Sequence, residues 1–352
     1  MTGIKATRSR VLVVGTGSIG KRHIRNLLGL GAEVAAFRYR SGAAASADPL
    51  PPGVSLVERL DQALVGPWDA VVIANSTDQH IPIALSAANN GKHLFIEKPL
   101  SNSLRGVNEL LWLSAERHLI VEAGFMLRFH PNLCWMRDYL RSGELGTLYY
   151  ARAQVGQYLP DWRPGTDYRQ SYSAHRGQGG GVILDLIHEL DFIAWLLGDV
   201  VDVAAMTNYI PHLQIETEAL AQISLRLSSG LLGQVHLDYL RPSYTRTLEI
   251  AGDQGVMVWD YPTGTITLTG RDGVARVVHR TPQEFERNDL FLAHMRHFLD
   301  RMGDREVEPG SPIRDAVAAL RVALACHKSA GERRFVRPEE IDEHFTITES
   351  KS

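Results

Sequence analysis

The sequence VLVVGTGSIG at residues 11–20 decides the fold of the first part of the chain. Its first four residues form a short apolar run that is typical of a buried strand, and its three glycines follow in the spacing G-x-G-x-x-G. Gly15 permits a tight turn, Gly17 lets the backbone approach a pyrophosphate, and Gly20 allows a helix to pack closely on the strand. The pattern predicts a strand, a turn and a helix whose N-terminus attracts phosphate charge; the alternative is a flexible turn in another kind of α/β protein.

Short apolar runs and helical periodicity continue to alternate up to about Gly124. The runs are apolar throughout instead of alternating with polar residues, which predicts parallel strands covered by helices on both faces, as in a Rossmann domain. The Ser-, Ala- and Pro-rich segment at residues 41–53 is expected to be a surface loop. The expected strands are Val11–Val14, Val34–Phe37, Ala70–Ala74, His93–Ile96 and Leu119–Ala123, and the expected helices are Ile19–Leu30, Ile81–Asn89 and Ser103–Glu116.

After about Phe125 the pattern changes to strand-rich text with helices at its two ends. Successive strands with glycine-containing turns predict a largely antiparallel sheet. The fold class is therefore α/β, with an N-terminal Rossmann domain at residues 1–125 and an α+β domain with an open sheet at residues 126–352, whose C-terminal helix could pack back on the first domain. The second domain is expected to contain helices at Asn132–Arg141, Leu290–Arg301 and Ile313–Lys328, a helix between Gly181 and Gly198, a strand at Thr147–Tyr158 and several strands between Leu220 and Leu268.

Composition and charge exclude several classes of function. The formal net charge is −3, which gives no electrostatic reason to expect a nucleic acid or an anionic membrane as a partner. Cys134 and Cys326 are the two cysteines of the sequence, and they lie too far apart to suggest a metal site or a disulfide framework. No window approaches the roughly 20 apolar residues of a membrane helix. We therefore expect a cytoplasmic protein without a metal centre.

The residues after the second expected strand indicate which dinucleotide would bind. A site for NAD usually has a carboxylate here, which binds the ribose 2′-hydroxyl. The sequence instead reads Phe37-Arg38-Tyr39-Arg40, and Glu33 lies before the strand. Two guanidinium groups favour a 2′-phosphate, so NADP is predicted, with NAD as the alternative; Arg38 and Arg40 would otherwise be solvated surface charges. The predicted cofactor-binding residues of this region are Gly15, Gly17, Ser18, Ile19, Gly20, Arg38 and Arg40.

The fourth apolar run ends in Glu97-Lys98-Pro99. A side chain at the carboxyl end of a parallel strand faces the edge of the sheet where ligands bind in open α/β folds. The proline after Lys98 restricts the lysine backbone and allows a cis peptide bond. Taken alone, a lysine at a strand end is more often a solvated charge.

Lys98 is not alone, because three motifs occur in one order along the chain. They are the glycine loop, Glu97-Lys98-Pro99, and the triple glycine at Gly179–Gly181 followed by Asp185 and His188. Together they resemble the Gfo/Idh/MocA family of sugar and inositol dehydrogenases, and the resemblance covers nearly the whole chain, including the domain order. It implies that Lys98 lies beside the nicotinamide and the substrate hydroxyl.

The resemblance also implies cofactor contacts after the third and fourth predicted strands. The segment at residues 73–80, IANSTDQH, is similar to the family segment that touches the cofactor. It adds Asn75, Thr77 and His80 to the predicted cofactor-binding residues, and the Glu-Lys-Pro motif adds Glu97 and Lys98. Without the resemblance, Asn75 and Thr77 would be a turn that enters a helix.

Asp185 and His188 are the candidate catalytic residues of the second domain. Members of the family typically carry this aspartate and histidine four residues apart, whereas here the spacing is three. Either spacing puts the two side chains on one face of a helix. Asp185 is the first choice of partner for His188, with Glu189 and Asp191 as alternatives. A buried histidine satisfied by hydrogen bonds is the structural explanation of the same residue.

Two further segments resemble substrate contacts. Arg128 and His130 lie where the first domain ends, and the segment at residues 160–169, PDWRPGTDYR, contains Trp162, Arg163 and Tyr168. Aromatic faces stack on sugar rings, and arginine binds carboxylate or phosphate. The alternative is that this loop packs against the sheet or against a neighbouring subunit. With Asp185 and His188, these five residues complete the predicted substrate site.

These residues predict an enzyme that transfers hydride reversibly between NADP and a CH–OH carbon of a sugar-like substrate. His188 is the candidate general base, oriented by Asp185, and Lys98 would stabilise the developing alkoxide. If the pKa of Lys98 is lowered beside the nicotinamide, Lys98 itself is the alternative base. The competing functions are a non-enzymatic dinucleotide-binding sensor and an NAD-dependent glycosidase-like enzyme. Family resemblance also suggests a homodimer or homotetramer formed through the open sheet.

Overall fold

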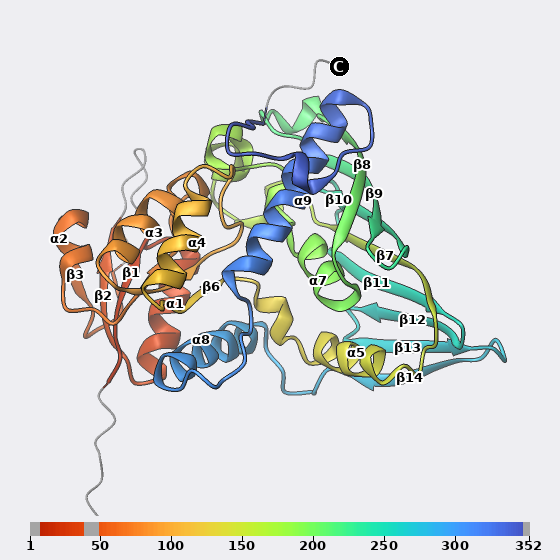
Figure 1. The fold of residues 1–352 in the computed structure, drawn as a ribbon, viewed down its shortest axis with the longest axis horizontal. Helices are drawn as coiled ribbons and strands as arrows, with labels where there is room; N and C mark the ends of the chain where they lie inside the picture. The colour runs from red at the N-terminus through yellow and green to blue at the C-terminus, as the bar shows by residue number, and fades with distance from the viewer. Residues whose placement is uncertain (1–7, 39–48, 348–352) are drawn as a thin grey trace, which may run out of the picture. The chain divides into compact units, whose positions relative to one another are not determined.

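The computed structural model describes residues 8–38 and 49–347, and this part of the chain divides into two compact units. The first unit contains the chain up to Leu100, Arg105–Met126 and Glu286–Arg314. The second contains Ser101–Leu104, Leu127–Phe285 and the chain from Asp315 onward. Most of the helices and strands of both units are labelled in Figure 1. The predicted division after residue 125 has a counterpart at Met126, while the later segment that starts at Glu286 groups with the first unit.

The first unit is built on a parallel sheet of six strands in the order β3-β2-β1-β4-β5-β6, which confirms the predicted Rossmann sheet. The side chains of Val11–Val14 in the central strand are fully buried, because helices cover both faces of the sheet. Ser55–Val57 forms an edge strand that was not predicted, since it is short and mostly exposed. The strands are β1 (Arg10–Val14), β2 (Glu33–Phe37), β3 (Ser55–Val57), β4 (Ala70–Ile73), β5 (His93–Ile96) and β6 (Val121–Ala123).

The helices of the first unit include one that is distant in the sequence. α8 packs against α1, and Met295 and Phe298 of α8 join Ile24 and Leu27 of α1 and Phe95 of β5 in one buried apolar cluster. The exposed face of such a helix is polar, so its apolar face determines where it packs. The helices are α1 (Ser18–Gly29), α2 (Leu60–Val65), the 3-10 turn η1 (Thr77–Gln79), α3 (His80–Asn89), α4 (Val107–Glu116) and α8 (Arg287–Gly303).

The second unit is built on a sheet of eight strands in the order β14-β13-β12-β11-β7-β10-β9-β8. Every neighbouring pair is antiparallel except β7 and β10, which confirms the prediction of a largely antiparallel sheet. β8 and β14 lie outside the range in which strands were predicted. The strands are β7 (Leu148–Gly156), β8 (Val200–Asn208), β9 (Leu220–Leu227), β10 (Leu232–Asp238), β11 (Thr245–Gly252), β12 (Gly255–Asp260), β13 (Thr265–Gly270) and β14 (Ala275–Arg280).

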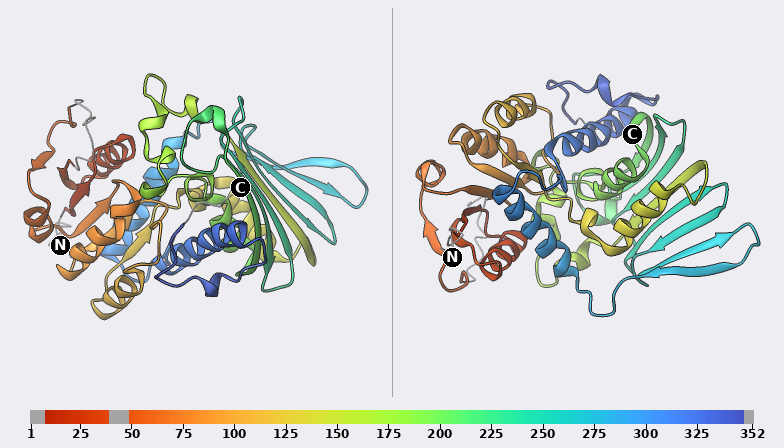
Figure 2. Two further views of the ribbon diagram at one scale, coloured as in Figure 1. Left: turned by 90° about the horizontal axis from the view of Figure 1, so that it is seen from above. Right: turned by 60° about the horizontal axis from the view of Figure 1, so that its bottom comes forward.

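Helices cover one face of this sheet and leave the other face bare, as Figure 2 shows. In β9, Ala221 and Ile223 are buried on the covered face, while Gln222 and Ser224 are exposed on the open one. Because buried and exposed residues alternate along these strands, the sequence has the period of two residues that predicts a strand. The helices are α5 (Pro131–Ser142), α6 (Val182–Asp185), α7 (His188–Leu197) and α9 (Ile313–Glu332), and the 3-10 turns are η2 (Met126–Phe129), η3 (Leu159–Trp162), η4 (Tyr168–Gln170), η5 (Tyr172–Ala174), η6 (Arg176–Gln178), η7 (Pro211–Leu213) and η8 (Pro338–Glu340).

The single helix expected between Gly181 and Gly198 is two helices. Leu186 has φ −102° and ψ 29°, outside the α-helical region, so α6 ends at Asp185 and α7 begins at His188. Gly198 ends α7 as predicted, with φ 103°. Asp185 and His188 therefore lie on two short helices instead of on one helical face.

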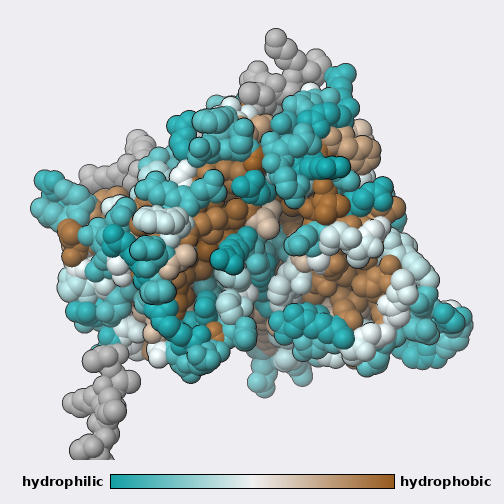
Figure 3. Space-filling model, viewed as in Figure 1, coloured by the Kyte–Doolittle hydropathy of each residue, from teal (hydrophilic) through white to brown (hydrophobic). Residues whose placement is uncertain are grey.

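None of the helices in the described residues is long and apolar enough to cross a membrane. Hydrophilic side chains cover much of the face drawn in Figure 3, and hydrophobic residues occur on it in separate areas. Within the described ranges, no group of three or more His, Cys, Asp or Glu side chains is arranged to hold a metal ion.

A buried carboxylate connects α8 to the sheet of the first unit. Glu122 of β6 is fully buried, and its carboxylate lies 3.3 Å from His294 Nε2 and accepts a hydrogen bond of 2.9 Å from Arg301. Burial raises the pKa of Glu122, but the hydrogen bonds from His294, His297 and Arg301 outweigh it and hold the pKa well below its usual range. The ionised carboxylate therefore stabilises the fold.

We predict that Glu122→Gln lowers the free energy of unfolding by about 3 kcal/mol, because it removes the buried counterion of Arg301 and the acceptor beside His294. The depressed pKa gives a stabilisation that is present above the ordinary pKa of 4.5 and is lost as the pH falls, so the stability of the variant should decline less in acid than that of the wild type. Urea unfolding at pH 7 and at pH 4 measures both effects. Glu116→Gln, an exposed change on α4, is the control and should leave both values unchanged. An equal acid dependence in Glu122→Gln and in the wild type would contradict the assignment.

Candidate functional site

The glycine loop after β1 has the close contacts that its spacing predicted. Gly15 has φ 103°, and a Cβ added there would lie 2.6 Å from the backbone of Ala74. A Cβ on Gly20 would lie 2.0 Å from Gly15 O. A Cβ on Gly17 would meet nothing within 4 Å. The protein itself therefore requires glycine at positions 15 and 20, whereas Gly17 faces open space before the first residues of α1, Ser18 and Ile19.

Arg38 lies at the end of β2, next to this loop. The backbone N–H of Gly15 donates a 3.0 Å hydrogen bond to Phe37 O, which holds the loop against the residue before Arg38. Arg38 Nε is buried and has no hydrogen-bond partner among the described residues. A buried donor without an acceptor fits a ligand that carries ribose or phosphate oxygens. Arg40 lies outside the described residues.

The turn after β4 contains the second group of predicted cofactor residues. Asn75 Oδ1 is buried without a partner in the described part of the chain, so it could accept a hydrogen bond from a ligand. Thr77 is buried at the start of η1. His80 lies with Nδ1 3.0 Å from Pro99 O and Nε2 3.2 Å from Asn75 O. Burial lowers the pKa of His80. A neutral imidazole has one N–H, so the ring can donate to one of these two carbonyl oxygens. Its contact with the cofactor stays a prediction.

Glu97, Lys98 and Pro99 follow β5 and form the third group. The peptide bond between Lys98 and Pro99 is cis, as the proline allowed. The carboxylate of Glu97 is turned into the protein, where Oε1 lies 2.6 Å from His23 Nε2 and Oε2 accepts a 3.1 Å hydrogen bond from Lys98 N. Burial raises the pKa of Glu97, but the hydrogen bond and charge of His23 and the charge of Lys98 hold it below its usual value. His23 was not predicted; the signal was a histidine on the face of α1 that carries the apolar residues.

In the second unit, Asp185 lies near two tyrosines that the sequence analysis did not single out, Tyr172 and Tyr239. The Tyr239 hydroxyl donates a 2.6 Å hydrogen bond to Asp185 Oδ2. Burial and the charge of Asp185 raise the pKa of both tyrosines well above its ordinary value. Both hydroxyls therefore stay protonated, and that of Tyr239 donates to the carboxylate.

Two of the predicted substrate residues pack on these tyrosines. The Trp162 ring meets Tyr239 edge to face at 5.2 Å, and the Arg163 guanidinium lies 5.6 Å from the centre of the Tyr172 ring. Trp162 Nε1 is buried without a hydrogen-bond partner among the described residues. The aromatic loop therefore gathers around Asp185, although no single stretch of sequence indicates this. Tyr168 lies elsewhere in the loop and donates to Leu213 O at 3.0 Å.

The three candidate carboxylates for His188 have different partners. Glu189 is buried and pairs with Arg246 at 2.7 Å, and Asp191 is buried and pairs with Arg128 at 2.6 Å. Asp185 Oδ2 accepts its 2.6 Å hydrogen bond from the neutral Tyr239 hydroxyl. Glu189 and Asp191 therefore each belong to a buried ion pair, and Asp185 stays the predicted partner of His188.

Arg128 and His130 both have structural contacts. Arg128 donates through three nitrogens to Asp191 and Asp315, and its side chain is 3% exposed. His130 Nδ1 accepts a 3.2 Å hydrogen bond from Asn132 N at the start of α5, and burial lowers the pKa of His130 to about 4. A neutral, buried ring is suited to capping a helix. The contacts of Arg128 and His130 with substrate stay predictions.

The position of Glu218 explains why residue 181, the last of three consecutive glycines, has no side chain. A Cβ on Gly181 would lie 2.3 Å from the Glu218 carboxylate, which accepts a 3.2 Å hydrogen bond from Ile183 N at the start of α6. Burial and the nearby charge of Asp185 raise the pKa of Glu218 to about 7. Glu218 therefore fixes the segment that carries Asp185. It lies 33 residues beyond Asp185 in the sequence, and only the fold brings the two together.

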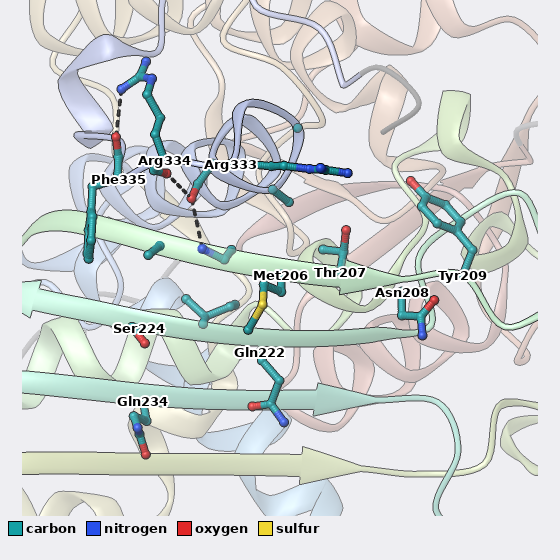
Figure 4. Close-up of a pocket in the computed structure, with 16 residues that line it drawn as sticks. Met206, Thr207, Asn208, Tyr209, Gln222, Ser224, Gln234, Arg333, Arg334 and Phe335 are labelled. Carbon is teal, nitrogen blue, oxygen red and sulfur yellow. Dashed lines mark hydrogen bonds between the residues drawn. The ribbon is translucent and has the colours of Figure 1, made fainter. Parts of the chain in front are cut away.

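A surface pocket of about 910 Å³ lies at the edge of the second sheet, where the end of α9 meets β8 (Figure 4). Ser329 accepts a hydrogen bond from Ala205 N at 3.0 Å and donates one to Arg334 O at 2.6 Å, which ties the two segments together. None of the predicted catalytic residues lines this pocket. It is lined by Ala204–Tyr209, Gln222–Ser224, Gln234, Ser329–Gly331 and Arg333–Phe335.

Comparison with known proteins agrees with this division of the chain. A model described as an oxidoreductase family with an NAD-binding Rossmann fold matches residues 9–125, and a model described as the GFO/IDH/MocA C-terminal domain matches residues 135–258. Myo-inositol 2-dehydrogenase of Thermotoga maritima is 27% identical over 284 residues, which are 78% of this chain and 80% of the relative. Inositol 2-dehydrogenase of Corynebacterium glutamicum is 29% identical over 339 residues, 93% of this chain and 94% of the relative.

The fold is also found among solved structures. Scyllo-inositol dehydrogenase from Lactobacillus casei, solved with bound NAD(H) and scyllo-inositol, superposes with a TM-score of 0.76 over 95% of this chain and 100% of that chain, at 22% identity. This likeness shows a shared fold. Together, the two family models cover the glycine loop, the Glu97-Lys98-Pro99 turn and the segment from Asp185 to His188, and the chain belongs to the Gfo/Idh/MocA family of oxidoreductases.

Proposed function

We propose that the protein is a nicotinamide-dependent dehydrogenase or reductase that acts on a CH–OH carbon of a sugar, inositol or nucleotide-sugar-like substrate. The observation that carries the proposal is the turn with Lys98 at the carboxyl end of β5, on the same edge of a parallel sheet as the glycine loop after β1. Relatives named as inositol dehydrogenases support the substrate class.

The dinucleotide would be held by groups that the first unit leaves available. Open space at Gly17 and the N-terminus of α1 suit the pyrophosphate, and the buried Asn75 Oδ1 and Arg38 Nε suit polar groups of the ligand. When bound, the nicotinamide ring supplies the hydride acceptor or donor. The chain must then orient the reacting carbon and manage one proton.

Lys98 and His188 are the residues proposed to manage that proton. In the direction of alcohol oxidation, His188 takes the hydroxyl proton as the carbon gives up its hydride, and Asp185 orients the imidazole. Lys98 donates a hydrogen bond to the same oxygen and stabilises its developing negative charge. In the alternative assignment Lys98 takes the proton itself, which requires a lowered pKa.

We propose NADP as the preferred dinucleotide. Arg38 follows β2, where a carboxylate that binds the ribose 2′-hydroxyl would otherwise stand, and its Nε has no acceptor in the described chain. A guanidinium at this place suits a 2′-phosphate, whose charge a carboxylate would repel. NAD is the alternative, and several solved relatives are complexes with NAD or NADH.

Lys98→Met is predicted to lower kcat by about 10³-fold or more, because it removes a donor to the reacting oxygen while keeping the length of the side chain. The dissociation constant for the dinucleotide should stay within about threefold, since the pyrophosphate contacts are unchanged. Lys92→Met is the matched control, because Lys92 precedes the same strand and bonds Gly66 O and Trp68 O at 2.8 and 3.0 Å. It should reduce stability and leave kcat unchanged. Full turnover by Lys98→Met would sink the proposed function.

Gly17→Ala and Gly20→Ala are predicted to fail in different ways. The methyl group at position 17 meets no protein atom, so stability should change by less than about 1 kcal/mol while dinucleotide binding weakens at least about tenfold. The methyl group at position 20 would lie 2.0 Å from Gly15 O, so that variant should lose about 3 kcal/mol or more of stability. Thermal unfolding and fluorescence titration with NADPH separate the two. Unchanged nucleotide affinity in Gly17→Ala would show that the loop does not hold the pyrophosphate.

Titration with NADPH and separately with NADH tests the choice of dinucleotide. We expect tighter binding of NADPH, and we expect Arg38→Gln to weaken NADPH at least about tenfold while leaving NADH within about threefold, because the guanidinium would contact the 2′-phosphate alone. Nucleotide fluorescence measures all four constants. Tighter binding of NADH by the wild type would overturn the preference and leave the oxidoreductase proposal in place.

A further inference from the structure

The side chain of Glu97 connects Lys98 to a helix that begins at the glycine loop. Glu97 is 7% exposed, and its two carboxylate oxygens have different partners. Oε1 lies 2.6 Å from His23 Nε2 on α1, and Oε2 accepts the 3.1 Å hydrogen bond from the backbone N–H of Lys98. One carboxylate therefore joins α1 to the backbone of the proposed catalytic lysine.

His23 is buried in an apolar environment that gives it no other polar contact among the described residues. The ring is 1% exposed and meets Phe95 of β5 and Phe291 of α8 edge to face at 5.2 and 6.3 Å. Its second nitrogen, Nδ1, is buried without a hydrogen-bond partner in the described ranges. Leaving a buried nitrogen unpaired costs free energy, and an apolar residue would avoid that cost. The bond to Glu97 is the contact that explains a histidine at this position.

Gly124 leaves the space that the Glu97 carboxylate occupies. A Cβ added to Gly124 would lie 2.8 Å from Glu97 Oε2. The backbone of Gly124 is not in the left-handed region, so its conformation does not require glycine. Glycine is suitable there because a side chain would collide with the Glu97 carboxylate. On the other side of Lys98, His80 Nδ1 lies 3.0 Å from Pro99 O. Lys98 is thus held at its own N–H by Glu97 and at the next residue by His80.

We infer that His23 is a positioning residue for Lys98, which it holds in place through Glu97. α1 begins immediately after Gly17, so this connection relates the position of Lys98 to the loop proposed to bind the pyrophosphate. The inference rests on the proposed catalytic role of Lys98. It gives Glu97 an internal positioning role in place of the contact with the cofactor that was predicted for it. A displacement of about 1 Å at a reacting group can lower a rate by about 10²-fold, so such a connection matters for turnover.

Two substitutions at position 23 and one at position 124 test the inference. His23→Leu removes the hydrogen bond to Glu97 and fills the space of the ring with an apolar side chain. His23→Gln keeps an N–H group near the position of Nε2. Gly124→Ala displaces the Glu97 carboxylate and leaves His23 intact. The matched control is His294→Leu, which removes another buried histidine–glutamate contact of the same unit, that of His294 with Glu122 at 3.3 Å.

Two readouts are measured for each variant. The first is hydrogen exchange of the Lys98 amide, followed in a peptide that contains Glu97 and Lys98, and it requires no substrate. The second is kcat and KM for a polyol oxidised by the wild type, together with the dissociation constant for NADPH. We expect His23→Leu and Gly124→Ala to speed exchange of the Lys98 amide about tenfold or more and to lower kcat by about 10- to 100-fold, with nucleotide affinity within about threefold. His23→Gln should recover most of both losses.

The control separates positioning from general destabilisation. His294→Leu should lower the melting temperature at least as much as His23→Leu and leave Lys98 exchange and kcat at the wild-type values. If His23→Leu and His294→Leu change exchange and kcat equally, or if His23→Leu leaves both unchanged, the inference is wrong. Lys98→Met is included in the same series: if it retains turnover, the proposed function fails, whereas the exchange measurement still decides whether His23 holds the backbone of Lys98.

Discussion

The close approach of α1 to the end of β1 is the constraint on which the first unit depends. Gly20 has no room for a Cβ beside Gly15 O, and Gly15 has none beside Ala74. This contact places the N-terminus of α1 at the edge of the sheet, where it can attract a phosphate. It also sets the direction of α1, so that His23, less than one turn after Gly20, reaches the carboxylate of Glu97 beyond the end of β5. A single packing contact thereby supports both the nucleotide loop and the lysine turn.

Three buried carboxylates of the second unit differ in the side chains with which the fold pairs them. Within one stretch of seven residues, Asp185 accepts a hydrogen bond from Tyr239, Glu189 pairs with Arg246 and Asp191 pairs with Arg128. The Tyr239 hydroxyl bonds Asp185 as a neutral donor, whereas the two arginines neutralise the other two carboxylates. Chemically similar side chains close together in sequence therefore acquire different roles through contacts with the residue after β10, with β11 and with the segment before α5.

Short-range sequence patterns predicted the strands and turns whose conformation depends mainly on neighbouring residues. Fully buried parallel strands read as continuous apolar runs, so β1, β2, β4 and β5 were found within one residue of their observed ends. β3 was missed because an exposed edge strand of three residues has no apolar run, and the break at Leu186 was missed because apolar periodicity continues across it. The glycine loop was interpretable because glycine geometry is itself local. The partners of Glu97 and Asp185 could not be predicted in this way, since His23 and Tyr239 lie 74 and 54 residues away from them.

The sequence by itself determined the fold class, the order of the two domains, the glycine loop and the identity of the motif residues that point to nicotinamide chemistry. Only the tertiary structure decided what each polar side chain faces: that Glu97 is turned inward to His23, that Trp162 and Arg163 gather around the tyrosines of Asp185, and that Arg128 is bound by Asp191 and Asp315. The physical reason is that propensity and hydrophobic period act over a few residues. Hydrogen bonds and ion pairs inside a protein instead depend on which segments packing brings within about 3 Å of one another.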